Sequence, residues 1–231
     1  WKKNAKTLKN IMLTLYKPCD KHVDGLAKQV AASRELKHMN MHLELDSIKT
    51  MYTMAHAIRQ LDHLKKLNLE IERTRISTTE QHTIAFEEIQ QAYVPWDESA
   101  ALKVAILSNL GSMAVLYFPT QSDTLEKLVL ENDPENGMVD ISNAWMTKHV
   151  KLTSLREFES ISMRDSLVYQ FIKHSTGTLN QIQFELPSKS DEESIENASD
   201  IDSKVDNGLM QCIGECHQLY ILRIVAKAIT P

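Results

Sequence analysis

The feature that most constrains the fold is a stretch of 76 residues, Cys19 to Val94, that contains no proline. Within it, apolar residues recur at intervals of three and four, the period of an amphipathic helix. The whole chain holds six Gly and six Pro among 231 residues, and these two residue types mark turns and hairpins. Their scarcity argues against a many-stranded sandwich or barrel. It predicts long helices.

The periodicity predicts a helix over 20–33 and a longer one over 35–72, which would extend about 50 Å. Two S-x-x-E capping boxes, in which each side chain bonds the other residue's free backbone N–H, predict further helix starts. They lie at Ser77–Glu80 and Ser154–Glu157. Helices are also expected over 97–110, with an extension towards 118, and over 123–130. The stretch 140–151 is ambiguous.

Towards the C-terminus the pattern changes. Ile182, Phe184 and Leu186 alternate with polar residues, which is the period of a strand. Residues 188–207 hold seven acidic residues and five serines and predict a flexible loop, whereas 208–231 are apolar on most faces and predict a buried helix. No repeat is recognised. The expected fold is an all-α bundle of about seven to nine helices over 1–187, with the last helix packing back on it.

Charge is distributed unevenly along the chain. Residues 1–75 carry a balance of +7, from 15 basic and 8 acidic residues, within an overall net charge of −5. Lysines alternate with apolar residues over 5–16, which predicts a short basic amphipathic helix. A solvated outer face explains these lysines better than direct contact with nucleic acid or a membrane surface. No apolar run reaches the roughly 18 residues that a membrane span needs.

Cysteine usage indicates the compartment and one candidate metal site. Three cysteines, ten methionines and a polar, basic start predict an intracellular protein, with a nuclear location favoured over a cytoplasmic one. Thiolates and imidazoles at short helical spacing can bind zinc. The candidate ligands are Cys19, His22, Cys212, Cys216 and His217. The site would draw on both segments, or on one segment and a partner's ligands; otherwise the cysteines are inert core residues.

A second polar cluster lies on the expected long helix. Glu35, His38, His42 and Asp46 would share one helix face, and Glu35 with His38 forms half of a di-iron motif. The second half is missing from the chain, so a solvated polar stripe is the favoured interpretation. Ser190 and Ser199 each precede an acidic residue by three positions, as in substrates of acidophilic kinases, although an inert surface loop is the simpler alternative.

The sequence contains none of the common phosphate-binding, nucleophile or metalloprotease motifs, which argues against an enzyme. We therefore expect a non-enzymatic bridging domain that holds partner segments in grooves between helices. A metal-binding helical protein or enzyme that uses the His and Cys clusters is the alternative. Homodimerisation through 35–72 is a further hypothesis.

The expected architecture resembles a known family. A long helix that follows the basic Trp1–Tyr16 segment, in a helical domain of this length, is similar to the TRF-homology docking domains of telomere (shelterin) proteins. The resemblance is architectural and carries no diagnostic motif. It implies a non-enzymatic docking hub in a nuclear complex.

Overall fold

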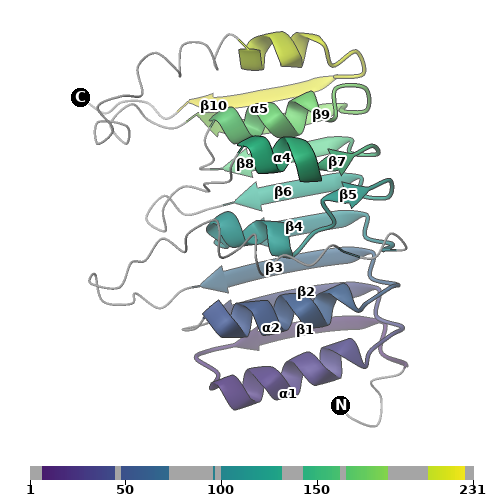
Figure 1. The fold of residues 1–231 in the computed structure, drawn as a ribbon, viewed down its shortest axis with the longest axis vertical. Coiled ribbons are helices and arrows are strands. Elements are labelled where there is room, and N and C mark those ends of the chain that lie inside the picture. Colours follow the sequence, from purple (N-terminus) through teal and green to yellow (C-terminus); the bar gives the residue numbers. More distant parts are fainter. Residues whose placement is uncertain are drawn as a thin grey trace, which may run out of the picture.

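The chain folds around one sheet of eight parallel strands (Figure 1). The computed structural model describes residues 7–44, 48–72, 96, 100–131, 143–161, 165–186 and 208–226. Each strand pairs with the next one along the chain, in the order β1-β2-β3-β4-β6-β8-β9-β10. The strands are β1 (Asn10–Leu15), β2 (His38–Glu44), β3 (Lys66–Glu72), β4 (Val104–Ser108), β6 (Lys127–Glu131), β8 (Glu157–Ile161), β9 (Gln181–Leu186) and β10 (Ile221–Ala226).

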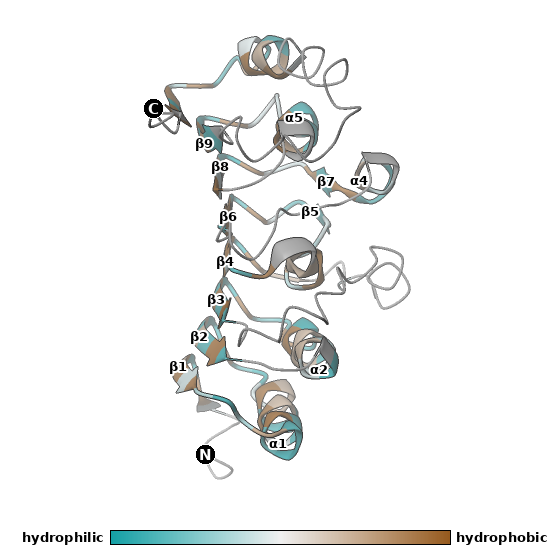
Figure 2. Ribbon diagram, turned by 90° about the vertical axis from the view of Figure 1, so that its left-hand side faces the viewer, coloured by the Kyte–Doolittle hydropathy of each residue, from teal (hydrophilic) through white to brown (hydrophobic). Residues whose placement is uncertain are grey.

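The described helices all cover the same face of this sheet (Figure 2). They are α1 (Asp20–Ala31), α2 (Ile48–Arg59), the 3-10 helix η2 (Gly111–Leu116), α4 (Asn143–His149) and α5 (Asp165–Lys173). A helical segment over 208–214 precedes β10. The short strands β5 (Gln121–Ser122) and β7 (Lys151–Leu152) pair with each other on this side. The sheet curves, so that its other face is concave and carries no described helix (Figure 2).

One side-chain pattern recurs at every strand of the main sheet. A leucine lies two residues before the strand, and the second and fourth strand residues point to the same side as that leucine, toward the helices. Around β3 these residues are Leu64, Leu67 and Leu69, which are 1%, 0% and 0% exposed. The pattern L-x-x-L-x-L, with one strand and one helical segment per unit, is typical of leucine-rich repeats. The leading leucines are Leu8, Leu36, Leu64, Leu102, Leu125, Leu155, Leu179 and Leu219.

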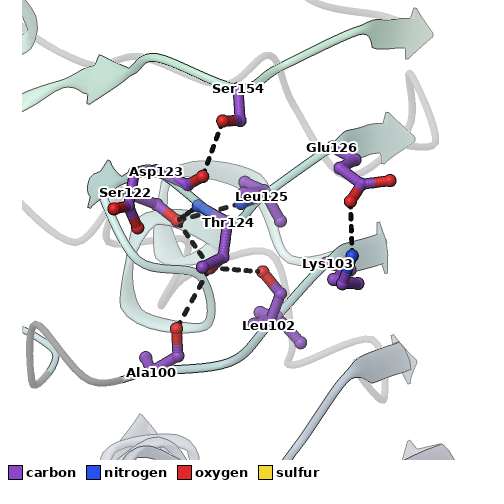
Figure 3. A network of polar contacts seen from close by, with 9 residues as sticks. All are labelled: Ala100, Leu102, Lys103, Ser122, Asp123, Thr124, Leu125, Glu126 and Ser154. Atoms are coloured by element: carbon purple, nitrogen blue, oxygen red, sulfur yellow. Dashed lines mark hydrogen bonds and ion pairs between the residues drawn. The ribbon is translucent and has the colours of Figure 1, made fainter.

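Adjacent repeats are joined by hydroxyl groups as well as by strand pairing (Figure 3). The Thr124 hydroxyl donates to the carbonyl oxygen of Leu102, at 3.1 Å. The Thr178 hydroxyl makes the equivalent bond to Leu155, at 2.7 Å. In each case the threonine directly precedes a leading leucine and reaches the leading leucine of the repeat before. These bonds satisfy carbonyl groups at the turns, where strand pairing has not yet begun.

The core lies between the sheet and the helices. The buried Tyr117, which follows η2, donates its hydroxyl to the carbonyl oxygen of Met51 at 2.7 Å. Arg59 donates from Nε and Nη2 to the carbonyl oxygen of Leu116, at 3.1 Å each. Phe158 stacks on Phe171, with ring centroids 5.1 Å apart. These contacts tie neighbouring helical segments to one another and to the sheet.

The prediction of an all-α bundle is wrong, because the chain is an α/β repeat structure with a parallel sheet. The expected helix over 35–72 is β2, α2 and β3 in succession. The basic helix over 5–16 is largely the strand β1, and the buried C-terminal helix is a short helical segment followed by β10. Likewise, β4 lies within 97–110, and β6 replaces the second half of the helix expected over 123–130 and ends one residue beyond it.

The physical reason is the way in which burial alternates along these segments. In β2 the apolar residues Met39, Met41 and Leu43 are two positions apart and each is 1% exposed. Together with the leading Leu36, they match both a three-and-four spacing and a two-residue spacing over a short window. The helix predicted from the Ser154–Glu157 capping box is also absent, because Glu157 is the first residue of the strand β8. The box at Ser77–Glu80 lies outside the described residues.

Two local predictions are confirmed. The expected helix over 20–33 is α1, which buries Val23, Ala27 and Val30 along one stripe. The alternation at Ile182 and Phe184 belongs to β9, which is an inner strand of the sheet.

Candidate protein-binding surface

The concave face is built from the strand residues that alternate with the core residues. Because the strands are parallel and in register, these side chains form rows that run across the sheet. The central row joins Met12, Asn40, Asn68, Ile106, Val129, Glu159, Gln183 and Arg223. Eight strands thus present a broad surface, with adjacent side chains of a row about 4.8 Å apart.

The middle of this face is apolar. Val104 and Ile106 of β4 are partly exposed, and Val129 of β6 is their 3%-exposed neighbour. Asn68 pairs with Ile106 on one side, and Glu159 pairs with Val129 on the other. An apolar centre with a polar surround is the general composition of a protein-binding surface.

The polar groups around that centre are held in place by one another. Lys127 Nζ lies 2.8 Å from Glu157 Oε2, and Gln183 Nε2 donates to Glu159 Oε1 at 2.7 Å. Ser108 donates its hydroxyl to Glu131 Oε2 at 3.0 Å. Since these side chains are already oriented, a ligand that contacts them loses less conformational entropy on binding.

The imidazole of His42 on β2 contacts two carboxylates of the concave face. Its Nδ1 lies 3.0 Å from Glu70 Oε2, and its Nε2 lies 3.5 Å from Glu72 Oε2. The hydrogen bond with Glu70 is the main cause that raises the pKa of His42 above 6.5, against a smaller opposing effect of burial. Tyr16 packs beside the imidazole, with ring centroids 6.1 Å apart. The charge of this cluster therefore depends on pH near neutrality.

The residues of the predicted zinc site lie in two separate places. Cys19 is exposed at the start of α1, and His22 is exposed within that helix. Cys212 and Cys216 are buried in the segment that leads to β10 at the other end of the sheet, and His217 is exposed after them. The structure therefore does not bring the two segments together. A site that combines one segment with a partner's ligands stays a prediction.

The two buried thiols are poorly suited to form thiolates. Cys216 donates its thiol to the carbonyl oxygen of Cys212 at 3.4 Å. Burial raises the pKa of Cys216 to about 11 and also raises that of Cys212. Across the part of the chain that the structure describes, no group of three or more His, Cys, Asp or Glu residues is placed to hold a metal ion.

The second polar cluster is also arranged differently from the prediction. His38 and His42 lie on the strand β2, not on a helix, and they share its concave side because they are four residues apart. Glu35 lies in the turn before that strand, and Asp46 lies outside the described residues. His38 Nδ1 is 2.8 Å from the side-chain oxygen of Asn10 on the neighbouring strand.

No protein-family model, curated protein or solved structure matches this chain. The resemblance to TRF-homology domains, the nuclear location and the homodimer stay predictions, although the helical architecture that suggested the resemblance is replaced by the repeat fold. None of the helices in the described ranges is long and apolar enough to cross a membrane.

The residues of the concave face were missed by the sequence analysis. The available signal was a leucine followed by apolar residues three and five positions later, which recurs at every strand of the main sheet except β8, where Ser160 holds the last position. The distances between leading leucines vary, however, from 23 residues between Leu102 and Leu125 to 40 between Leu179 and Leu219. This irregular spacing conceals the period from any search at a fixed interval.

Proposed function

We propose that this chain is a non-enzymatic interaction module that binds a segment of a partner protein on its concave face. The observation that carries the proposal is the partly exposed apolar centre at Val104 and Ile106, on a sheet face that no described helix covers. A few well-packed residues near the centre of an interface contribute most of its binding free energy when the surrounding contacts exclude water.

The repeat architecture supports this use. Stacked repeats form an extended concave surface, and each inner strand is paired on both sides with its neighbours. A ligand that crosses several strands can contact residues of several repeats at once. The long, continuous rows of side chains favour an extended or helical protein segment over a small molecule.

The titratable groups on the face also support a binding role over a catalytic one. Glu157, Glu159 and His42 are engaged in ion pairs or hydrogen bonds with neighbouring side chains. Such contacts fix the shape and charge of the face. They orient these side chains for contact with a bound protein segment.

The test compares variants of the face with a matched variant elsewhere. Partner proteins are captured from the native source on immobilised wild-type chain, identified by mass spectrometry, and titrated with Ile106→Ala, Asn68→Arg and Thr53→Arg. Thr53 is partly exposed on α2, a helix that covers the opposite side of the sheet. The proposal predicts a partner whose affinity falls about tenfold or more with either face variant.

The Thr53→Arg variant introduces the same charge and bulk as Asn68→Arg, and it should bind like the wild type. Far-ultraviolet circular dichroism of each variant checks that the sheet is intact. If every captured protein binds the two face variants and the wild type equally well, the concave face is not the binding surface.

A further inference from the structure

A row of lysines runs along one rim of the sheet, outside the concave face. Four successive repeats place a lysine directly after the leading leucine and directly before the strand. These residues, which we call the lysine row, are Lys9, Lys37, Lys65 and Lys103. The same position in the next repeats holds Glu126 and Arg156.

Backbone hydrogen bonds fix the alignment of the lysine row. The carbonyl oxygen of Lys9 accepts the N–H of Lys37 at 2.8 Å, that of Lys37 accepts the N–H of Lys65 at 2.8 Å, and that of Lys65 accepts the N–H of Lys103 at 2.9 Å. Neighbouring lysines are thus separated by one strand spacing, about 4.8 Å. The side chains project from a regular backbone ladder.

Lys103, the last lysine of the row, shows which kind of group binds at this position. Lys103 Nζ lies 2.6 Å from Glu126 Oε1, a carboxylate at the equivalent position one repeat further on (Figure 3). This contact is the main cause that lowers the pKa of Glu126. Among the described residues, Lys9, Lys37 and Lys65 have no such carboxylate, and Lys9 and Lys65 are exposed. Within the described ranges, these three aligned cations, one strand apart, therefore have no paired carboxylate.

We propose that Lys9, Lys37 and Lys65 bind an acidic segment of a partner protein, whose carboxylates take the place that Glu126 occupies beside Lys103. The Cβ atoms of residues three and four apart on a helix are about 5–6 Å apart, which is close to the strand spacing. An acidic helix laid across the rim can therefore place one carboxylate beside each lysine in turn.

A protein segment suits this rim better than a single-stranded nucleic acid does. Binding of single strands without sequence preference combines cations with aromatic side chains on which bases stack. The exposed aromatic residue nearest in sequence to Lys9 is Tyr16, which follows the opposite end of β1. The residues that directly follow Lys9, Lys37 and Lys65 are Asn10, His38 and Lys66, and none of them is a Phe, Tyr or Trp on which a base could stack.

The lysine row goes beyond the function proposed for the concave face and can be tested separately. The two surfaces lie at different places on the same repeats, so one chain can hold two protein segments at once. Failure of one site leaves the other intact, because the lysine row includes none of the side chains in the apolar centre.

The experiment uses a synthetic alanine-based helical peptide of about 16 residues, with Glu at every third or fourth position. Its affinity for the full chain is measured by fluorescence anisotropy at low salt. The triple variant K9A/K37A/K65A should bind about tenfold more weakly, since each exposed ion pair contributes modestly and three are lost. Salt should weaken binding to the wild type more than binding to the variant.

The control variant K21A/K28A/K49A removes the same charge from exposed positions on α1 and α2. It should bind the peptide like the wild type, and a peptide with Gln in place of Glu should bind neither protein. The proposal is overturned if the peptide does not bind the wild type, or if both triple variants lose affinity equally. Tighter binding of a single-stranded DNA of similar length, lost with K9A/K37A/K65A, would overturn it in favour of a nucleic-acid site.

Discussion

The imidazole of His42 on β2 lies 3.0 Å from the carboxylate of Glu70 on the neighbouring strand β3. The register places these two residues directly opposite each other. The contact is therefore a cross-strand ion pair when His42 is protonated, and Glu72 lies 3.5 Å from the second ring nitrogen. The pair links two repeats on the concave face, and its contribution to the stability of the fold depends on pH.

The first prediction concerns this dependence. The folded-state pKa of His42 is raised above 6.5, so protonated His42 stabilises the folded state. This contribution is fully present below the unfolded-state pKa and is lost as the pH rises through the higher folded-state pKa. The difference in free energy of unfolding between wild type and His42→Gln should therefore be larger at about pH 5.5 than at about pH 8.5. Urea denaturation at several pH values measures it.

His38→Gln serves as the control for this measurement. His38 lies on the same side of β2 but contacts Asn10, which carries no charge. Its substitution should not reproduce the pH dependence seen with His42→Gln. If the free energy of unfolding differs between wild type and His42→Gln by the same amount at every pH, the ion pair with Glu70 does not stabilise the fold.

The second prediction concerns the hydroxyl bonds between repeats. Thr178→Val keeps the shape of the side chain but removes the donor to the carbonyl oxygen of Leu155. The free energy of unfolding should fall by about 1 kcal/mol, the usual net value of one such bond. Thr53→Val, which removes a bond within the exposed face of α2, should cost less. Equal costs for the two variants would show that the link between repeats has no special value.

The third prediction concerns the buried tyrosine behind the sheet. Tyr117→Phe removes the donor to the carbonyl oxygen of Met51 and leaves that oxygen without this partner in the core. We expect a loss of about 1–3 kcal/mol in the free energy of unfolding. Tyr220→Phe, at a residue that is 69% exposed, should change it little. A neutral Tyr117→Phe variant would contradict the assignment of this bond to the core.

The fourth prediction separates the three cysteines by reactivity. Cys19 is exposed, whereas Cys212 and Cys216 are buried and their thiols have raised pKa values. A disulfide reagent near pH 8 should label one thiol quickly and two slowly. Cys19→Ser should remove the fast phase, which is followed by absorbance. Fast labelling of all three thiols in the folded protein would contradict the burial of Cys212 and Cys216.

The spacing of apolar residues predicted local structure correctly where it fits only one type of element. Val23, Leu26 and Val30 are spaced three and four residues apart, which fits only a helix, and they lie in α1. It failed where strand and helix follow each other closely. From Leu36 to Ile71 apolar residues occur at two-, three- and four-residue spacings, which fit both strands and helices. This stretch contains no proline or glycine to mark the turns between β2, α2 and β3.

The candidate surface could not be predicted because its residues are not close in sequence. Asn68, Ile106 and Val129 are adjacent only because successive repeats place them in one row. The lysine row was visible as a basic N-terminal part of the chain, but its alignment depends on the same register. The proposed zinc ligands failed to meet for the converse reason, since Cys19 and Cys216 belong to repeats at opposite ends of the sheet.

The most direct test of the central claim is photo-crosslinking from the concave face. A benzophenone amino acid is introduced in place of Ile106 in one sample and in place of Lys49, on the helical side, in another. The proposed function predicts that a partner protein is crosslinked from position 106 and not from position 49. Crosslinking of the same partner from position 49 alone would show that the chain binds through its helices and would contradict the account.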